Sequence, residues 1–323
     1  MTAASRPARP ARLGPNQYGK AETRVVRIVR EGATHHIKDL NVSVALSGAM
    51  DDVHLTGSNA SVLTTDTTKN TVFAFAKEHG IDSAEQFAIH LARHFVGGQP
   101  TIHRARIRIE EYGWERIPTA KEGEHSFVRT GQETRTTEVT FDGELWQVIS
   151  GLKDLVVMNS TDSEFRGFLK DEYTTLQETD DRVLATEVAA RWRFGWTGAA
   201  DPGDTGGDGA DGVDGTNEDS GAAPDWDESY RAVRGHLLTA FADTYSRSLQ
   251  QTLYAMGSRV VEHREEVVEV RLSLPNKHHF LVDLAPFGLK NDNEVYLAAD
   301  RPYGLIEGTV LREGEAPGIP VTD

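Results

Sequence analysis

The chain has 323 residues, carries a formal net charge of −16 at pH 7 and contains no cysteine. The length suggests two average domains or one large one, the acidic charge argues against a nucleic-acid partner, and the lack of cysteine excludes disulfides, thiolate nucleophiles and thiolate-bound zinc. No apolar run is long enough to cross a membrane, and residues 1–15 lack an apolar signal core, so we expect a loose tail on a cytoplasmic protein with no membrane partner.

The first domain is expected over residues 16–122, where strand and helix patterns follow one another. The expected elements are a hairpin over 22–46, helices over 69–80 and 83–98, and an extended segment over 101–117. Apolar and polar residues alternate over residues 40–46, a pattern typical of a half-buried strand. The second helix begins with the capping pair Ser83 and Gln86.

The same order of elements recurs in a second domain, which is expected over residues 123–312. Its expected elements are a hairpin over 134–159, helical segments over 162–173 and 182–194, helices over 226–245 and 248–264, and strands over 266–274 and 279–284. The hairpin has Asp142 and Gly143 at its turn, a pair typical of short connections between antiparallel strands.

This repeated order indicates an α+β fold of two tandem domains, each with a curved, four-stranded antiparallel sheet and helices on one face. Each such sheet leaves two open edges. Closing those edges into a barrel needs neighbouring chains, so we expect an oligomer. The alternative is an ordinary two-domain α+β monomer.

Residues 198–225 differ from the rest of the chain in composition. Residues 201–220 include seven acidic residues, six glycines and no lysine or arginine. They cannot bury apolar surface, so we expect a disordered, solvated insertion. Residues 206–214 fit one calcium-binding nonapeptide, but such repeats need several stacked copies, and we expect a flexible loop instead. Residues 313–323 are expected to form a C-terminal tail.

Six short stretches stand out for their residue types and their order. They are "YGK" (18–20), "TTDTTKNTV" (64–72), "FRGFLKDEYTTL" (165–176), "DDR" (180–182), "SLQQTLY" (248–254) and "SLPNKHHF" (273–280). Together they resemble the signature blocks of the urate oxidase family, and the resemblance extends from about Gln17 to Arg312. It implies two tunnelling-fold (T-fold) domains in each chain and a homotetramer with active sites at subunit interfaces. It also implies that urate, dioxygen and water react to give 5-hydroxyisourate and hydrogen peroxide, with no cofactor and no metal.

The resemblance implies a catalytic relay of Lys20, Thr65 and His278. A threonine hydroxyl is a useless base by itself near neutral pH, but a neighbouring lysine amine can activate it. Imidazole titrates near neutral pH and can pass protons to and from the lysine. Either histidine of "KHH" could serve, and the family motif favours the one directly after Lys277. The resemblance further implies that Lys20 and Thr65 of one site come from different chains.

The resemblance also implies how the flat, anionic urate is bound. Arg182 offers a planar fork for bidentate contact, Gln250 offers a donor and an acceptor, and Phe165 is expected to stack on the ring. Two backbone N–H groups at helix starts, those of Asp66 and Leu249, are expected to bind as well, because helix N-termini favour anions.

Asn276 with Thr65 is expected to hold a water molecule or dioxygen above the urate ring. For Arg182, the alternative is a surface salt bridge with Asp180 or Asp181. For Phe165, the alternative is an ordinary place in the core.

Two other functions remain open at this point. One is a pterin- or purine-processing enzyme on the same fold, which would commonly anchor the ring with a glutamate and in some cases use zinc. The other is a non-catalytic urate-binding sensor that has lost the relay. His90 and His94 are four residues apart on an expected helix, but no third ligand is evident, so we interpret them as an exposed helix face.

Overall fold

The computed structural model describes residues 11–119, 125–198 and 222–321. Its helices and strands are, in chain order, β1 (Tyr18–Glu31), β2 (Thr34–Gly48), α1 (Asp52–Leu55), α2 (Thr65–Glu78), α3 (Ala84–Gly98), β3 (Ile102–Glu111), β4 (Trp114–Arg116), β5 (Phe127–Arg129), β6 (Thr134–Phe141), β7 (Trp146–Asn159), β8 (Leu184–Phe194), α4 (Trp226–Asp243), α5 (Leu249–His263), β9 (Val267–Leu281), the 3₁₀ helix η1 (Ala285–Phe287) and β10 (Tyr296–Leu311). Most of the expected insertion, residues 199–221, lies outside the described residues.

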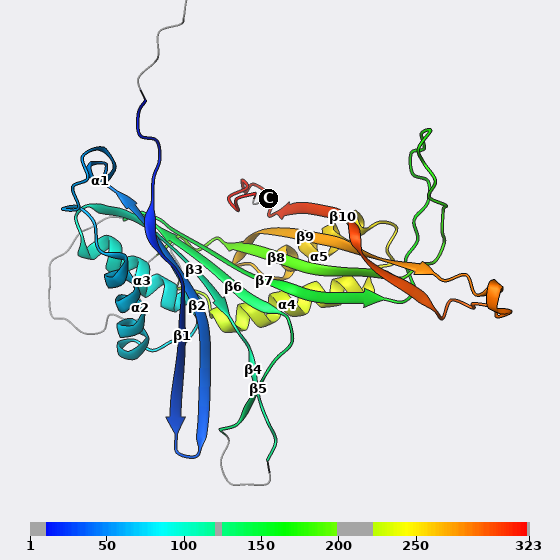
Figure 1. Cartoon of the computed structure of the whole chain (residues 1–323), viewed down its shortest axis with the longest axis horizontal. Coiled ribbons are helices and arrows are strands. Elements are labelled where there is room, and N and C mark those ends of the chain that lie inside the picture. Colours follow the sequence, from blue (N-terminus) through cyan, green and yellow to red (C-terminus); the bar gives the residue numbers. More distant parts are fainter. Residues whose placement is uncertain (1–10, 120–124, 199–221, 322–323) are drawn as a thin grey trace, which may run out of the picture.

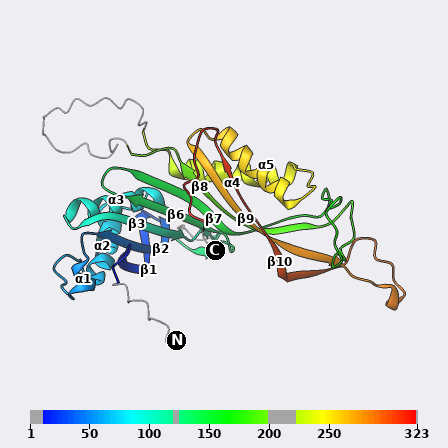
Figure 2. The same cartoon turned by 90° about the horizontal axis from the view of Figure 1, so that it is seen from above.

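Eight strands form one antiparallel sheet in the order β1-β2-β3-β6-β7-β8-β9-β10. Helices α2 and α3 lie beside its first half, and α4 and α5 lie beside its second half (Figures 1 and 2). The predicted α+β class, with antiparallel strands and helices on one face, is confirmed. The two predicted four-stranded sheets are joined into one, because β3 pairs with β6.

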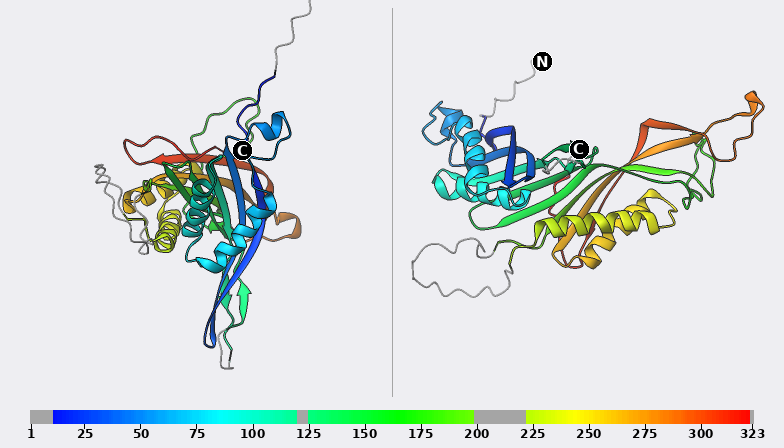
Figure 3. Two further views of the ribbon diagram at one scale, coloured as in Figure 1. Left: turned by 90° about the vertical axis from the view of Figure 1, so that its left-hand side faces the viewer. Right: turned by 90° about the horizontal axis from the view of Figure 1, so that it is seen from below.

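Strand register explains why both helix pairs share a face of the sheet. Val44 lies opposite Ile107, Ile107 opposite Val139, and Val139 opposite Val148, and all four side chains are buried. Residues directly opposite one another in a ladder point to the same side. Figure 3 shows the helices packed along that side, and the alternation predicted for residues 40–46 is confirmed.

The prediction of a helix over residues 182–194 is wrong. This segment is β8, in which buried side chains such as Val188, Ala190 and Trp192 alternate with half-buried ones. Residues 162–173 also form no helix. They make a loop in which Phe165 pairs through its backbone with Thr179.

Each helix pair has two strands before it and two strands after it in the large sheet, and this order indicates a boundary between the two repeats. β1 and β2 precede α2, while β3 and β6 follow α3. β7 and β8 precede α4, while β9 and β10 follow α5. This order would put the division in the β6–β7 turn, whereas the boundary at residues 122 and 123 stays a prediction.

The predicted C-terminal tail is partly described, and it is anchored to the sheet. The carboxylate of Glu269 is fully buried and accepts hydrogen bonds from the backbone N–H of Gly318 (2.8 Å) and of Ile319 (3.1 Å). Arg193 donates to the same carboxylate (2.8 Å) and to the carbonyl of Ala316 (2.9 Å). Residues 316–319 are therefore packed against the second half of the sheet.

Candidate active site

Helix α2 begins in the run of five threonines, and four of these make local hydrogen bonds. Thr64 caps the helix by accepting from the backbone N–H of Thr67 (3.0 Å), and the two hydroxyls are 2.8 Å apart. Thr68 and Thr71 each donate to the carbonyl four residues earlier. Within the described residues, only the hydroxyl of Thr65 in this run has no hydrogen-bond partner, and it is exposed. It is available to a ligand.

The start of α2 also presents free backbone donors and a nearby cation. The N–H groups of Thr65 and Asp66 lie in the first turn, where no intrahelical acceptor exists. Lys69 donates to the Asp66 carboxylate (2.5 Å) and Asn70 does so too (2.9 Å), which lowers the pKa of Asp66. The charge of Lys20 lowers the pKa of Asp66 further, so Lys20 lies within electrostatic range of this helix start.

Lys20 and Thr65 of one chain therefore lie in the same region of the molecule. Lys20 is on β1, opposite Val44, and the hydroxyl of Tyr18 accepts from the N–H of Leu63 (2.8 Å), which ties the segment before α2 to β1. That Lys20 and Thr65 of one site come from different chains stays a prediction. We call Lys20, Thr65 and Asp66 the Thr65 end.

Arg182 lies in the loop before β8 and has no ion pair within the described residues. Its Nε donates to the Oγ of Ser163 (3.1 Å), and its Cζ lies 5.1 Å from the ring centroid of Phe165. Burial lowers the pKa of Arg182 below its usual value. Asp180 instead pairs with Arg166, so the alternative of a salt bridge to Arg182 is wrong for Asp180.

The other neighbouring acid, Asp181, accepts from the hydroxyl of Thr161 (3.1 Å) and forms no ion pair with Arg182. The guanidinium is therefore a half-buried cation with no carboxylate partner among the described residues. A cation in this state favours a bound anion, because an anion would offset the cost of removing the charge from water.

Phe165 and the start of α5 lie near this cation. Phe165 is half-buried, stacks on Phe168 with ring centroids 5.1 Å apart, and is therefore no ordinary core residue. Helix α5 begins at Leu249, with Ser248 as its cap accepting from Gln251 (3.2 Å). The Leu249 side chain is buried, and the Gln250 side chain is exposed with no hydrogen bond to any described residue.

Asn276 and His278 lie two residues apart on β9, so they point to the same face of the strand. Asn276 is opposite Thr186 of β8 and Gly304 of β10, and the ring of His278 stacks on Phe280 at 5.8 Å. His279 points to the other face and is bonded to the carbonyl of Lys277 (3.0 Å). The choice of His278 as a relay member stays a prediction.

The predicted site residues therefore form two groups. We call the second group the Arg182 end; it comprises Phe165, Arg182, Leu249, Gln250, Asn276 and His278. In Figure 1 the starts of β1 and α2 lie at one end of the sheet, while the green loop after β7 and the orange end of β9 lie at the other. A single chain holds the two groups apart.

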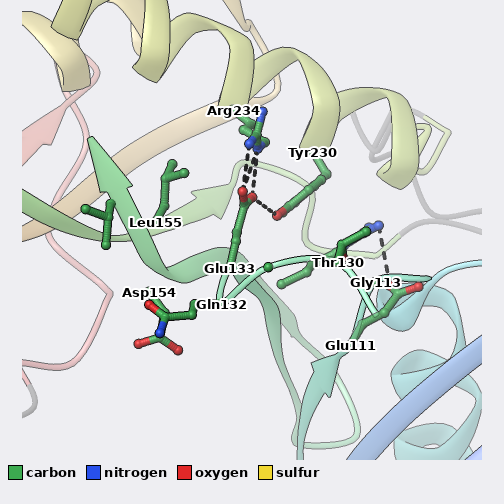
Figure 4. A pocket seen from close by; sticks show the side chains of 12 residues that line it. Glu111, Gly113, Thr130, Gln132, Glu133, Asp154, Leu155, Tyr230 and Arg234 are labelled. Atoms are coloured by element: carbon green, nitrogen blue, oxygen red, sulfur yellow. Dashed lines mark hydrogen bonds and ion pairs between the residues drawn. The ribbon is translucent and has the colours of Figure 1, made fainter. Parts of the chain in front are cut away.

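A cavity of about 640 Å³ lies between the two halves of the sheet, away from both ends (Figure 4). Three of its polar groups bind one another: Tyr230 donates to Glu133 (3.0 Å), and Arg234 binds the same carboxylate through two nitrogens. None of the predicted site residues lines it. We therefore assign the polar groups of this cavity to the packing of α4 against β6.

Sequence reasoning missed Ser163 at the Arg182 end, and it considered Ser246 only as a possible helix cap, a place that Ser248 takes. Both are fully buried, and Ser163 is the hydrogen-bond partner of Arg182. Ser163 falls in the segment 162–173, for which a helix was expected, and Ser246 falls between two expected helices, so no pattern in the sequence indicates that these two serines meet. Among the described residues, no three His, Asp or Glu side chains lie close enough to hold a metal ion, and no helix is long and apolar enough to cross a membrane.

Comparisons with known proteins add independent evidence. A family model described as Uricase matches residues 16–140 and 148–307. Uricase from Arthrobacter globiformis is 45% identical over 309 residues, which cover 96% of this chain and 93% of the relative. Uricase from Danio rerio is 35% identical over 306 residues, covering 93% of this chain and 94% of the relative.

Solved structures agree with this match. The crystal structure of the Arthrobacter globiformis uricase has a TM-score of 0.84 and 46% identity, covering 97% of this chain and 99% of that chain. Urate oxidase from Bacillus sp. TB-90 has a TM-score of 0.72 at 20% identity, covering 92% of this chain and all of that chain, which supports the fold alone.

Proposed function

The chain belongs to the uricase family, and from this membership we propose that it oxidises urate with dioxygen and water to 5-hydroxyisourate and hydrogen peroxide, without a cofactor. One urate, one dioxygen and one water give one molecule of each product, so the reaction balances without another reactant. The observation that carries the proposal is the unpaired Arg182 cation beside the Phe165 ring and the α5 start. A flat anion suits this surface.

The chemical difficulty lies in dioxygen, which is a triplet and accepts one electron at a time. A protein can favour this transfer by removing a proton from the urate anion, because the doubly charged ring is a better electron donor. This step needs a base and groups that stabilise the new charge. We assign the base to the Thr65 hydroxyl with Lys20, and the passage of protons onward to His278.

The Arg182 end would bind the urate anion in this scheme. The Arg182 fork would contact adjacent acceptors on one edge of the ring, and Gln250 would contact a carbonyl and an N–H of the other edge. Phe165 would stack on the ring. The Leu249 N–H at the start of α5 would donate to the anion, and the Asp66 N–H of the Thr65 end would do the same.

Completing a site requires the Thr65 end of one chain to meet the Arg182 end of another. The strands β1 and β10 are both open edges of the sheet, which supports assembly by edge pairing. We propose a homotetramer in which two chains form each site, and in which Asn276 and Thr65 from different chains hold water or dioxygen. A cytoplasmic location stays a prediction.

An oxygen electrode tests the proposed function. Metal-stripped protein is mixed with urate, and oxygen uptake, urate absorbance and peroxide are followed together. We expect equal molar consumption of oxygen and urate, with peroxide formed in the same amount. Urate binding without oxygen uptake would indicate the sensor instead. Activity only on a pterin, or only with added zinc, would indicate the other enzyme of this fold.

A further inference from the structure

Ser163 is the single described hydrogen-bond partner of the Arg182 guanidinium. Its side chain is fully buried, and its Oγ accepts from the Arg182 Nε at 3.1 Å. The two terminal nitrogens of Arg182 make no hydrogen bond to any described residue. The bond to Nε therefore leaves the terminal pair of N–H groups directed away from Ser163 and open to a ligand.

Ser163 is itself fixed to the segment before α5. Its loop forms a short parallel bridge with Ser246, in which the N–H of Glu164 donates to the Ser246 carbonyl (2.8 Å). The N–H of Ser246 donates to the carbonyl of Asp162 (2.9 Å). These two bonds set the distance between the Arg182 loop and the helix start.

Ser246 continues the connection into α5. Its side chain is fully buried, and its Oγ donates to the carbonyl of Ser248 (3.2 Å) while it accepts from the Thr252 hydroxyl (2.8 Å). Ser248 is the cap of α5, and Thr252 is buried in its first turn. A continuous hydrogen-bonded path thus runs from the guanidinium to the N-terminus that presents Leu249 and Gln250.

We infer that Ser163 is a positioning residue for urate binding, since it fixes the Arg182 fork relative to the α5 N-terminus. An arginine side chain loses rotamer freedom when it is held in one geometry. Here the contacts with Ser163 and with the Phe165 ring hold the Arg182 side chain in one geometry before any ligand binds. Preorganised groups bind more tightly, because binding no longer has to order them. The inference rests on the proposed role of Arg182.

The Ser163→Ala variant tests this inference through the split between KM and kcat. Losing a hydrogen bond to a charged group should raise the KM for urate about tenfold, while kcat changes little because the Thr65 end is untouched. The matched control is Ser160→Ala, which removes the hydroxyl of an exposed serine in the same loop that has no described partner. We expect its KM to equal that of the wild type.

A double-mutant cycle with Arg182→Ala separates positioning from a general structural role. Urate affinity is measured by equilibrium dialysis without dioxygen, so that weak variants can be compared. We expect Ser163→Ala to weaken urate binding in the wild-type background and to have no further effect when Arg182 is absent. An equal loss in both backgrounds would overturn the inference.

The failure of the inference is distinct from the failure of the proposed function. If Arg182→Ala weakens urate binding and Ser163→Ala does not, the positioning role of Ser163 is wrong while the role of Arg182 stands. If Arg182→Ala binds urate as well as the wild type does, both are wrong.

Discussion

The two ends of the sheet hold their site residues in different ways. At the Thr65 end the hydroxyl is exposed and makes no hydrogen bond to any described residue, and the nearby contacts of Asp66 are exposed charge pairs. At the Arg182 end the binding groups rest on the buried hydroxyls of Ser163 and Ser246. Lys20 and Thr65 are thus available but incomplete as a site in one chain, whereas Arg182 and the start of α5 are already held by buried hydrogen bonds.

Substitutions at the Thr65 end should change the reaction rate and leave stability unchanged. We expect Thr65→Ala and Lys20→Met each to lower kcat by about 10²–10⁴, the usual contribution of a positioned acid or base. The double mutant should be no worse than additive. Turnover and the thermal unfolding midpoint are measured on the same samples. Thr71→Ala, on the same helix, is the control and should keep its rate. Near-full activity in both single variants would show that the relay assignment is wrong.

A substitution between the two ends should destabilise both equally. Glu85 of α3 is fully buried and accepts from Arg135 (2.7 Å), Thr137 (2.9 Å) and Ser150 (2.5 Å). Arg135 also binds Asp227 of α4 (2.5 Å), so the network joins the two halves. Burial alone would lower the pKa of Arg135, but these carboxylates raise it.

We therefore expect Glu85→Ala to lower the free energy of unfolding by about 3–5 kcal/mol, because it breaks a buried ion pair and leaves the buried Thr137 and Ser150 hydroxyls without their acceptor. Urea unfolding followed by tryptophan fluorescence measures the change. We expect one unfolding transition for the whole chain, with its midpoint shifted to a lower urea concentration. A loss below 1 kcal/mol would show that the network does not couple the halves.

Removing the buried Ser246 hydroxyl should lower both the stability and the urate affinity of the Arg182 end. Ser246→Ala leaves the Thr252 hydroxyl with a weaker partner and should cost about 1–3 kcal/mol of unfolding free energy. The control is Ser258→Ala, since the Ser258 hydroxyl is buried and has no described partner. Its removal should be nearly neutral. Equal costs in the two variants would mean that Ser246 acts only by filling space.

Acid should weaken the Thr65 end, and the effect is the smallest of those proposed. Lys69, Asn70 and Lys20 hold the pKa of Asp66 below its usual value of 3.8. The stabilisation is thus fully present above that usual value and is lost as pH falls through the lower folded pKa. The unfolding free energies of the wild type and Asp66→Asn should converge over that range, and added salt should reduce their difference. A difference that grew with acid would contradict this.

The sequence correctly predicted those elements in which the hydrophobic period and the intrinsic preferences of the residues indicate the same secondary structure. Residues 40–46 alternate and are rich in β-branched residues, and the expected helices over 83–98, 226–245 and 248–264 have caps and apolar faces. The β8 segment has alanines, arginines and leucine, which favour a helix when the chain is considered alone. Pairing with β7 and β9 on both sides overrides this preference.

The site residues show the same contrast between local pattern and long-range contact. Lys20, Thr65 and Arg182 occur in short motifs that can be recognised without a structure, whereas Ser163 lies in the segment 162–173, for which the sequence indicated a helix and the structure shows a loop. Its burial and its bond to Arg182 arise from the bridge to Ser246, which is 83 residues away in the sequence and follows α4. Contacts of this range cannot be derived from local pattern.

Mixed assemblies of two inactive variants test most directly whether two chains form each site. Thr65→Ala and Arg182→Ala are co-expressed and purified together. Half of the interfaces should be mixed, and each should contain one intact and one doubly altered site, so about a quarter of the wild-type activity should return. Lys20→Met mixed with Thr65→Ala should also regain activity if, as expected, Lys20 and Thr65 of one site come from different chains. No recovery in the first mixture would contradict the shared site.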